Sequence, residues 1–199
     1  MRIISERKGF QADHSSTSYE FLAVDGVLSA EDKQAVGKLS SRARPTDTRV
    51  SFVYEGEGYD LPGGWRPLME RYYDVMFSES YSWWTLALSF PADANLLRTL
   101  ESYAFWGVDD RGVEIRTADG RVVVTLYCRL QADFASADSF LELLAANRAL
   151  LMEGDCRLFY GMWELYGKGQ EWAEGTPPDT DMAGLPQAAK QLLDMMTSA

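Results

Sequence analysis

The single histidine of the chain, His14, lies in the segment QADHSSTS (residues 11–18), beside an acid and several hydroxyl side chains. Asp, His and Ser form catalytic triads, but a triad needs side chains that converge from separate elements, whereas neighbours on an extended chain point to opposite sides. His14 is therefore the only candidate general base, and no GxSxG motif supplies a nucleophile for it. We favour a turn in which Asp13, Ser15 and Ser16 cap backbone groups before a strand.

Metal and thiol chemistry find little support in the sequence. Zinc sites need three or four His, Cys or carboxylate ligands, and one histidine without an HxH or HExxH pattern does not provide them. Cys128 and Cys156 form no CxxC pair, and a chain of 199 residues needs no disulfide staple. We expect two reduced, buried thiols, no metal and no cofactor.

Arginines gather in the segment SSRARPTDTR (residues 40–49), after a predicted helix. Cations near a helix C-terminus interact favourably with the helix dipole, so a solvated basic patch is the simpler interpretation of Arg42, Arg44 and Arg49. The alternative is a site that holds an anion.

The segment ERYYDVMFSESYSWW (residues 70–84) is rich in aromatic residues beside Asp74 and Glu79. Most of its rings should be core, but Tyr73, Tyr81 and Trp83 fall off the predicted core face and would suit a pocket rim or an interface. Together with the 11–18 loop and the arginines, this segment defines the candidate ligand-binding residues: Asp13, His14, Ser15, Ser16, Arg42, Arg44, Tyr73, Glu79, Tyr81 and Trp83.

The spacing of hydrophobic residues along the chain alternates between a period of two, typical of strands, and a period of about 3.6, typical of helices. These strands and helices must position the residues named above. Strands are predicted at 17–24, 48–55 and 82–90 and in a hairpin over 113–130 that turns at Asp119-Gly120. Helices are predicted from Ser29 to about Arg42, over 65–76, after Pro91, over 136–153 and over 155–166. The order βαβ, α, βαββ, αα predicts a single layered α+β domain with a mixed five-stranded sheet and parallel crossovers.

The end of the chain differs in composition. We expect the α+β domain to occupy residues 1–172, a Pro/Gly/Asp linker to follow at 173–183, and a C-terminal amphipathic helix to cover 184–199. So short a helix needs a surface to pack on, either its own domain or another chain.

The formal charge is −11, because 19 basic residues face 30 acidic ones. An acidic surface repels phosphate backbones, so we expect no direct nucleic-acid binding and no membrane, and instead a protein partner or a homo-oligomer. The N-terminal segment lacks the apolar core of a secretory signal, and no stretch of 18 apolar residues occurs. We expect a cytoplasmic protein.

Three segments, GFQADHSSTSYEF (9–21), SSRA (40–43) and RYYDVMFSESYSWWTL (71–86), resemble an uncharacterised bacterial protein family without assigned activity. Proteins of the family that the chain resembles are associated with genes for SWIM-type zinc-finger proteins. The resemblance therefore implies an accessory role beside a nucleic-acid-binding partner. It implies no chemistry for any residue.

Two classes of function remain. The favoured one is a non-enzymatic, acidic protein-interaction or accessory module, which accounts for the charge, the off-core aromatics and the lack of a recognisable catalytic set. The alternative is a small-molecule-binding protein or enzyme whose site joins the 11–18 loop, the 40–49 arginines and the 70–84 aromatics.

Overall fold

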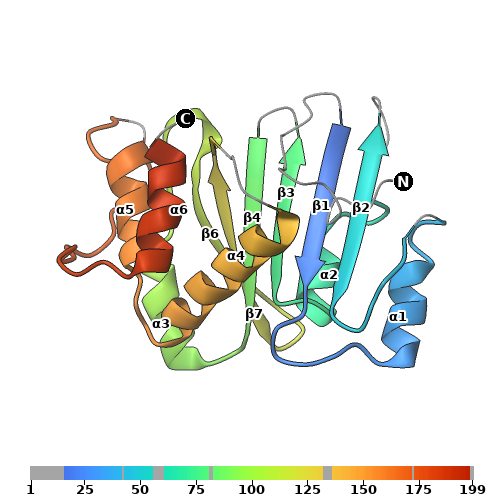
Figure 1. Ribbon diagram of the computed structural model, residues 1–199. Helices are drawn as coiled ribbons and strands as arrows, with labels where there is room; N and C mark the ends of the chain where they lie inside the picture. Colours follow the sequence, from blue (N-terminus) through green and yellow to red (C-terminus); the bar gives the residue numbers. More distant parts are fainter. Residues whose placement is uncertain are drawn as a thin grey trace.

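A computed structural model of the chain describes residues 16–41, 43–55, 61–80, 83–131, 136–171 and 173–197. These residues form an α+β fold around one antiparallel sheet with the strand order β2-β1-β3-β4-β7-β6-β5 (Figure 1). Its strands are β1 (Ser16–Leu22), β2 (Arg49–Glu55), β3 (Val75–Ser80), β4 (Trp83–Pro91), β5 (Phe105–Trp106), β6 (Gly112–Ala118) and β7 (Arg121–Cys128). The helices are α1 (Ala30–Gly37), α2 (Arg66–Arg71), α3 (Ala94–Glu101), α4 (Ala137–Met152), α5 (Arg157–Tyr166) and α6 (Gln187–Thr197).

The predicted α+β class is confirmed, but the prediction of five strands is wrong, because the sheet has seven. One extra strand, β3, begins at Val75, at the end of the segment predicted as a helix over 65–76, and continues beyond it, whereas α2 already ends at Arg71. Met76 fits a helical stripe that starts at Trp65, and it equally fits a strand that is buried on both faces, so periodicity alone could not separate the two. The other extra strand, β5, has two residues and is too short to give a periodic signal.

The predicted parallel crossovers are also wrong, since every strand pair among the described residues is antiparallel. The connection through α1 starts and ends at the same end of the sheet, where the Ala23 amide donates to the Thr48 carbonyl at 2.8 Å. The chain therefore returns as an antiparallel neighbour of β1 without crossing the sheet.

Local signals that depend on a few residues are confirmed. Ser29 and Asp32 form a capping box at the start of α1, and Ser136 caps α4. Asp119 and Gly120 both have positive φ (49° and 77°) in the two-residue turn between β6 and β7, which suits a type I′ hairpin.

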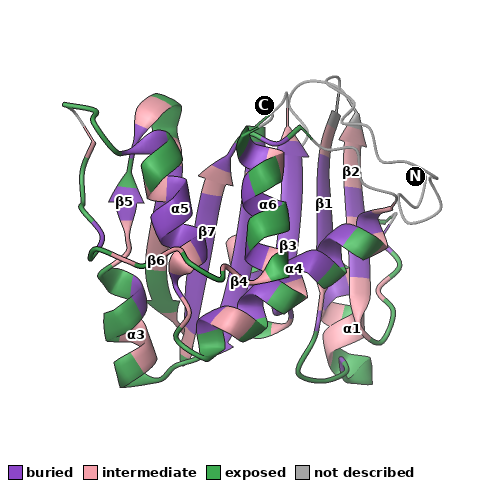
Figure 2. Cartoon of the chain, turned by 60° about the vertical axis from the view of Figure 1, so that its left-hand side comes forward, coloured by how far each residue is buried: buried purple, intermediate pink, exposed green. Residues whose placement is uncertain are grey.

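Helices cover both faces of the sheet, so the molecule has two cores. Figure 1 shows α3, α4, α5 and α6 on the near side of the sheet and α2 behind it. Even-numbered residues of β4 and β7 point toward α4, as Leu86 and Val124 do, whereas Phe21, Met76 and Ala87 belong to the core on the α1–α2 side. The central strands are buried almost along their whole length in Figure 2.

Helix α6 packs on α4 and α5 through its apolar face, where Ala189, Leu192, Leu193 and Met196 are buried. Asn147 of α4 donates its side-chain amide to the Ala188 carbonyl at 3.1 Å. Before α6, Glu174 forms a two-way backbone bridge with Trp106, and Arg157 donates to the carbonyls of Ala183 and Gly184. Asn147 of α4 thus binds the first turn of the last helix, and Arg157 of α5 binds the chain that leads into it. Over the described ranges, every helix is too short or too polar to cross a bilayer.

Candidate functional site

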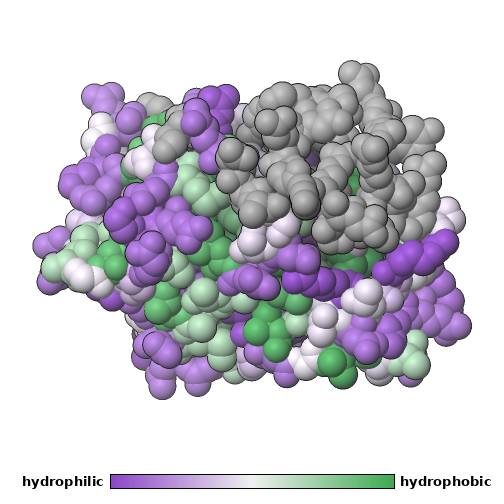
Figure 3. Space-filling model, in the orientation of Figure 1, coloured by the Kyte–Doolittle hydropathy of each residue, from purple (hydrophilic) through white to green (hydrophobic). Residues whose placement is uncertain are grey.

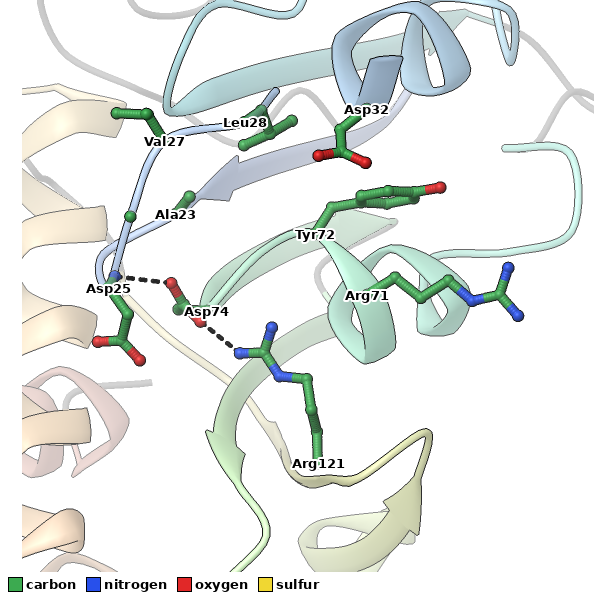
Figure 4. A pocket seen from close by; sticks show the side chains of 10 residues that line it. Ala23, Asp25, Val27, Leu28, Asp32, Arg71, Tyr72, Asp74 and Arg121 are labelled. Atoms are coloured by element: carbon green, nitrogen blue, oxygen red, sulfur yellow. Dashed lines mark hydrogen bonds and ion pairs between the residues drawn. The ribbon is translucent and has the colours of Figure 1, made fainter. Parts of the chain in front are cut away.

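A cavity of about 240 Å³ lies between the β1–α1 loop, the end of α2 and the start of β7 (Figure 4). Its walls combine carboxylates, guanidinium groups and small apolar side chains. The lining residues are Ala23, Asp25, Gly26, Val27, Leu28, Asp32, Arg71, Tyr72, Asp74 and Arg121.

Asp74 occupies the centre of this cavity and is almost completely buried. Its Oδ2 accepts hydrogen bonds from the backbone amides of Val24 (2.6 Å) and Asp25 (2.9 Å), and its Oδ1 pairs with Arg121. Burial alone would raise the pKa of Asp74, but the two amides and Arg121 together hold that pKa below its usual value. Asp74 is therefore an ionised anchor for the β1–α1 loop.

Arg148 reaches the same loop from α4, on the other side of Asp74. Its Nη1 donates to Asp25 Oδ1 at 2.9 Å, its Nη2 pairs with Asp25 Oδ2, and its Nε donates to the Ser89 carbonyl at 2.7 Å. Arg148 Nη2 also lies 3.8 Å from Asp74 Oδ1. Two carboxylates and two guanidinium groups, Asp25, Asp74, Arg121 and Arg148, thus form one network, which we call the loop-anchoring network.

The loop-anchoring network fixes the backbone of the β1–α1 loop through hydrogen bonds and ion pairs, and the loop presents apolar side chains to solvent. Val27 is 73% exposed and Val24 is 42% exposed. In Figure 4 the side chain of Val27 points away from Asp74, and Arg71 extends outward, where it pairs with Asp119 at 3.0 Å. On the described part of the face in Figure 3, hydrophobic side chains stand among hydrophilic ones below the grey atoms.

A second buried carboxyl group, Glu20, lies on the α4 side of β1. Its Oε2 accepts a hydrogen bond from Ser51 Oγ at 2.5 Å, and its Oε1 has no hydrogen-bond partner among the described residues. Burial raises the pKa of Glu20 to about 7, against smaller lowering effects of the Ser51 hydroxyl and the Arg49 charge.

The structure does not gather the described members of the predicted ligand-binding set into one site. Tyr73 is fully buried against Phe21 in the α1–α2 core, with ring centroids 5.4 Å apart, and Glu79 is buried in β3 on the opposite face. Arg44 is exposed and donates to the carbonyls of Ser41 and Ala43, and Trp83 is exposed at the start of β4. Arg49 pairs with Asp138 of α4.

The remaining members of that set cannot be placed in the same way. Asp13, His14, Ser15, Arg42 and Tyr81 lie outside the described residues, and Ser16 is placed only as the first residue of β1. The expectation of a site around His14 therefore stays a prediction.

Sequence reasoning missed Asp25, Arg121 and Arg148, although one of them left a signal. Arg148 interrupts the apolar face of the helix FLELLAANRALL, four residues after Leu144 and three before Leu151, both of which are buried. A charged residue at a core position of a helix implies a partner of opposite charge, because an unpaired buried charge is strongly unfavourable. The partners are Asp25, which is half-exposed, and the buried Asp74, and both are distant in the sequence and could not be named from it.

The described residues offer few other reactive groups. They contain no cluster of three or more His, Cys, Asp or Glu side chains that could hold a metal ion. Cys128 and Cys156 are free and buried, and burial raises the pKa of both thiols, that of Cys156 to about 12. Such thiols are poor nucleophiles at neutral pH.

Comparisons with known proteins do not assign the chain to a family. The chain matches no protein-family model, and neither a curated protein nor a solved structure is detectably similar to it.

Proposed function

We propose that the protein is a non-enzymatic interaction module and that the β1–α1 loop is its docking surface for a protein partner. The observation that carries the proposal is a pair of exposed valines, Val24 and Val27, on a loop fixed by the loop-anchoring network, in which Asp74 and Arg148 are buried. Exposed apolar side chains are common singly, but a rigid loop that presents two of them has already lost the conformational entropy that binding would otherwise cost.

The charge of the whole chain favours a basic partner. Three aspartates (Asp25, Asp32 and Asp74) and two arginines (Arg71 and Arg121) line the cavity, and Arg148 pairs with Asp25 from behind, so the charges around the loop balance in a chain of −11. A Lys or Arg side chain next to an apolar one on the partner would complement both the valines and this charge.

The size of this cavity and the state of its acid favour an interaction role for the loop over a substrate site at the same place. About 240 Å³ is below the roughly 300–1,000 Å³ of typical small-molecule pockets, and it suits a single side chain better than a substrate. Asp74, whose pKa is lowered, stays ionised at neutral pH and has its oxygens engaged by the loop and Arg121, which leaves it poorly suited to exchange protons with a ligand.

The test compares Val27→Glu with the matched control Leu165→Glu, since Leu165 is an exposed apolar residue on α5, away from the loop. We expect both variants to melt within about 2 °C of the wild type, as is usual for exposed positions. In quantitative affinity purification from the native cell, Val27→Glu should lose at least 90% of one partner that Leu165→Glu retains, a loss of about tenfold or more in affinity.

The partner is then purified and its affinity measured directly, because capture from a lysate alone does not establish a contact. Equal affinity of the wild type and Val27→Glu for every captured protein would refute the proposed docking surface.

A further inference from the structure

The two edges of the sheet differ in how the chain covers them. At one edge, β5 has only two residues, and Trp106 exchanges backbone hydrogen bonds with Glu174 at 2.8 and 2.9 Å. At the other edge, β2 has seven residues and pairs with β1 alone among the described residues. Figure 1 shows β2 as the outermost strand on that side, with α1 near the end at which the strand begins. The sheet therefore has one blunted edge and one long edge.

Hydrogen bonds near the start of β2 show which of its backbone groups point outward. The Ala23 amide donates to the Thr48 carbonyl, so these two residues form a hydrogen-bonded pair between the strands. Arg49 faces the other way, because its amide donates to Thr46 Oγ1 at 2.9 Å and its carbonyl accepts from the Thr46 amide at 2.8 Å. Every second residue of β2, counted from Arg49, therefore turns its amide and carbonyl away from β1.

Beyond Arg49, the outward-turned residues include Ser51 and Val53, which are half-buried. Their amides and carbonyls have no hydrogen-bond partner among the described residues. The strand contains no proline and no lysine, and its register with β1 runs without a bulge, so the usual devices that stop an edge strand from pairing are missing here. We call positions 51–55 the open edge.

We propose that the open edge pairs with the open edge of a second copy of the chain, antiparallel and about a two-fold axis at Val53. In this register the two Val53 residues face each other and Ser51 faces position 55 of the other copy, which gives about six hydrogen bonds between the chains. Phe52 then lies opposite Tyr54 of the second copy, an aromatic pair of the kind that stabilises sheets.

The composition and geometry of the open edge favour a second copy as its occupant. Ser51, Phe52, Val53 and Tyr54 are uncharged, so pairing with the same segment brings no like charges opposite each other there. Position 49 of each copy lies beyond the end of β2 of the other, which leaves the Thr46 turn and α1 outside the paired segment. The proposal does not depend on the function proposed for the β1–α1 loop.

Sedimentation velocity of the full chain measures the dimer. So short a strand pair buries less area than a permanent dimer does, and we expect a Kd of about 1–100 µM. Two copies that each carry a charge of −11 repel each other, so higher salt should tighten the dimer, whereas it would weaken binding to a basic partner. A wild type that stays monomeric at about 500 µM, in low and in high salt, overturns the proposal.

Val53→Pro tests the edge without removing a hydrogen bond to β1. Proline lacks the amide, which at this position bonds only across the proposed interface, so dimerisation should weaken by about tenfold or more. Val53→Ala is the matched control, because it loses the same side chain but keeps the amide, and it should dimerise within about fivefold of the wild type. Melting curves show whether the two variants fold alike, and equal Kd values for them overturn the proposal.

Charges at the two-fold axis test the register, and they decide the matter if Val53→Pro does not fold. Val53→Lys and Val53→Glu each bring like charges together, whereas a mixture of the two variants brings opposite charges together. We expect the mixed dimer to be about 2- to 30-fold tighter than either homodimer. Thr117→Lys and Thr117→Glu, at an exposed position of β6, should show no such preference.

A mixture that dimerises no more tightly than the single Val53 variants overturns the proposed pairing. A monomeric wild type that binds a purified protein, and loses it on Val53→Lys but not on Thr117→Lys, would also overturn it and would assign the open edge to that protein.

Discussion

Asp74 and Glu20 are both almost completely buried, at 4% and 3% exposure, yet their surroundings drive their pKa values in opposite directions. The Asp74 carboxylate accepts hydrogen bonds from two backbone amides and a guanidinium group, and its pKa is lowered. The Glu20 carboxyl group accepts a hydrogen bond from one hydroxyl, and its pKa is raised to about 7. The number of donors aimed at a carboxylate, rather than its burial, decides whether the folded protein holds it charged.

The two carboxyl groups therefore contribute to stability in opposite pH ranges. A lowered folded-state pKa means that Asp74 stabilises the fold above its unfolded pKa of about 3.8, and that this contribution is lost as pH falls through the folded pKa. A raised folded-state pKa means that the contribution of Glu20 is fully present below its unfolded pKa of about 4.5 and is lost as pH rises through about 7.

The largest effect is expected from Asp74→Asn. The neutral side-chain amide cannot pair with Arg121 as the carboxylate does. Its NH2 group must also face either Arg121 or the two backbone amides, which are all donors. We therefore expect a loss of about 3–5 kcal/mol in the free energy of unfolding at pH 7. Urea denaturation measures it, and the deficit should shrink as pH falls from about 3.8, where the carboxyl of the unfolded chain takes up a proton, through the lower pKa of the folded carboxyl.

Asp119→Asn is the matched control, because Asp119 pairs with the exposed Arg71 at the surface and asparagine tolerates its positive φ. Its stability should equal that of the wild type. A loss below about 1 kcal/mol for Asp74→Asn would mean that the network does not anchor the loop.

A smaller effect of opposite sign is expected from Glu20→Gln. The difference between pKa values of about 7 and 4.5 corresponds to on the order of 3 kcal/mol, which wild-type stability loses between these two pH values and the amide variant does not. The variant should therefore be more stable than the wild type at pH 8 and similar to it at pH 4. Denaturation curves at both pH values decide this, and a variant that is less stable at pH 8 would show that Glu20 is stabilising as a carboxylate.

The smallest effect is expected from Ser51→Ala, which removes the hydroxyl donated to Glu20. The loss should be about 1.5–3 kcal/mol at pH 8, where the acceptor is charged, and about 0.5–1.5 kcal/mol at pH 4, where it is neutral. Ser18→Ala is the control on the same face, because the Ser18 hydroxyl is buried without a hydrogen-bond partner among the described residues. If the two alanine variants lose equal stability at pH 8, the Ser51 hydrogen bond does not stabilise the charged form.

Much of the fold follows from sequence because its determinants are local. Ser29, Ser136 and the Asp119-Gly120 turn act within a few residues, and all three predictions are confirmed. Strand β3 was missed because Val75 to Ser80 is buried on nearly every residue, so no alternation distinguishes it from a helix. Strand direction was missed because it depends on where connections end, which the sequence does not specify.

The candidate site was less predictable because it depends on contacts between residues far apart in sequence. Asp74 was noticed only as a neighbour of aromatic residues, whereas its structural partners come from β1–α1 and β7. Trp83 was correctly placed off the core, since strand alternation alone fixes that. Its neighbours Tyr127 and Arg129 come from the end of β7 and the residue that follows it, and no local pattern brings them together.

The position of β1 between β2 and β3 sets the order in which the sheet can form. Tyr19 pairs with Phe52 on one side and Ser78 on the other, whereas β6 and β7 meet through a two-residue turn. Closing the long loops is entropically slower than closing the hairpin, so we expect β6 and β7 to form early and β1 to insert late. Substitutions in β1, Glu20→Gln among them, should then change the unfolding rate, while destabilising substitutions at Gly120, whose φ is positive, change the folding rate.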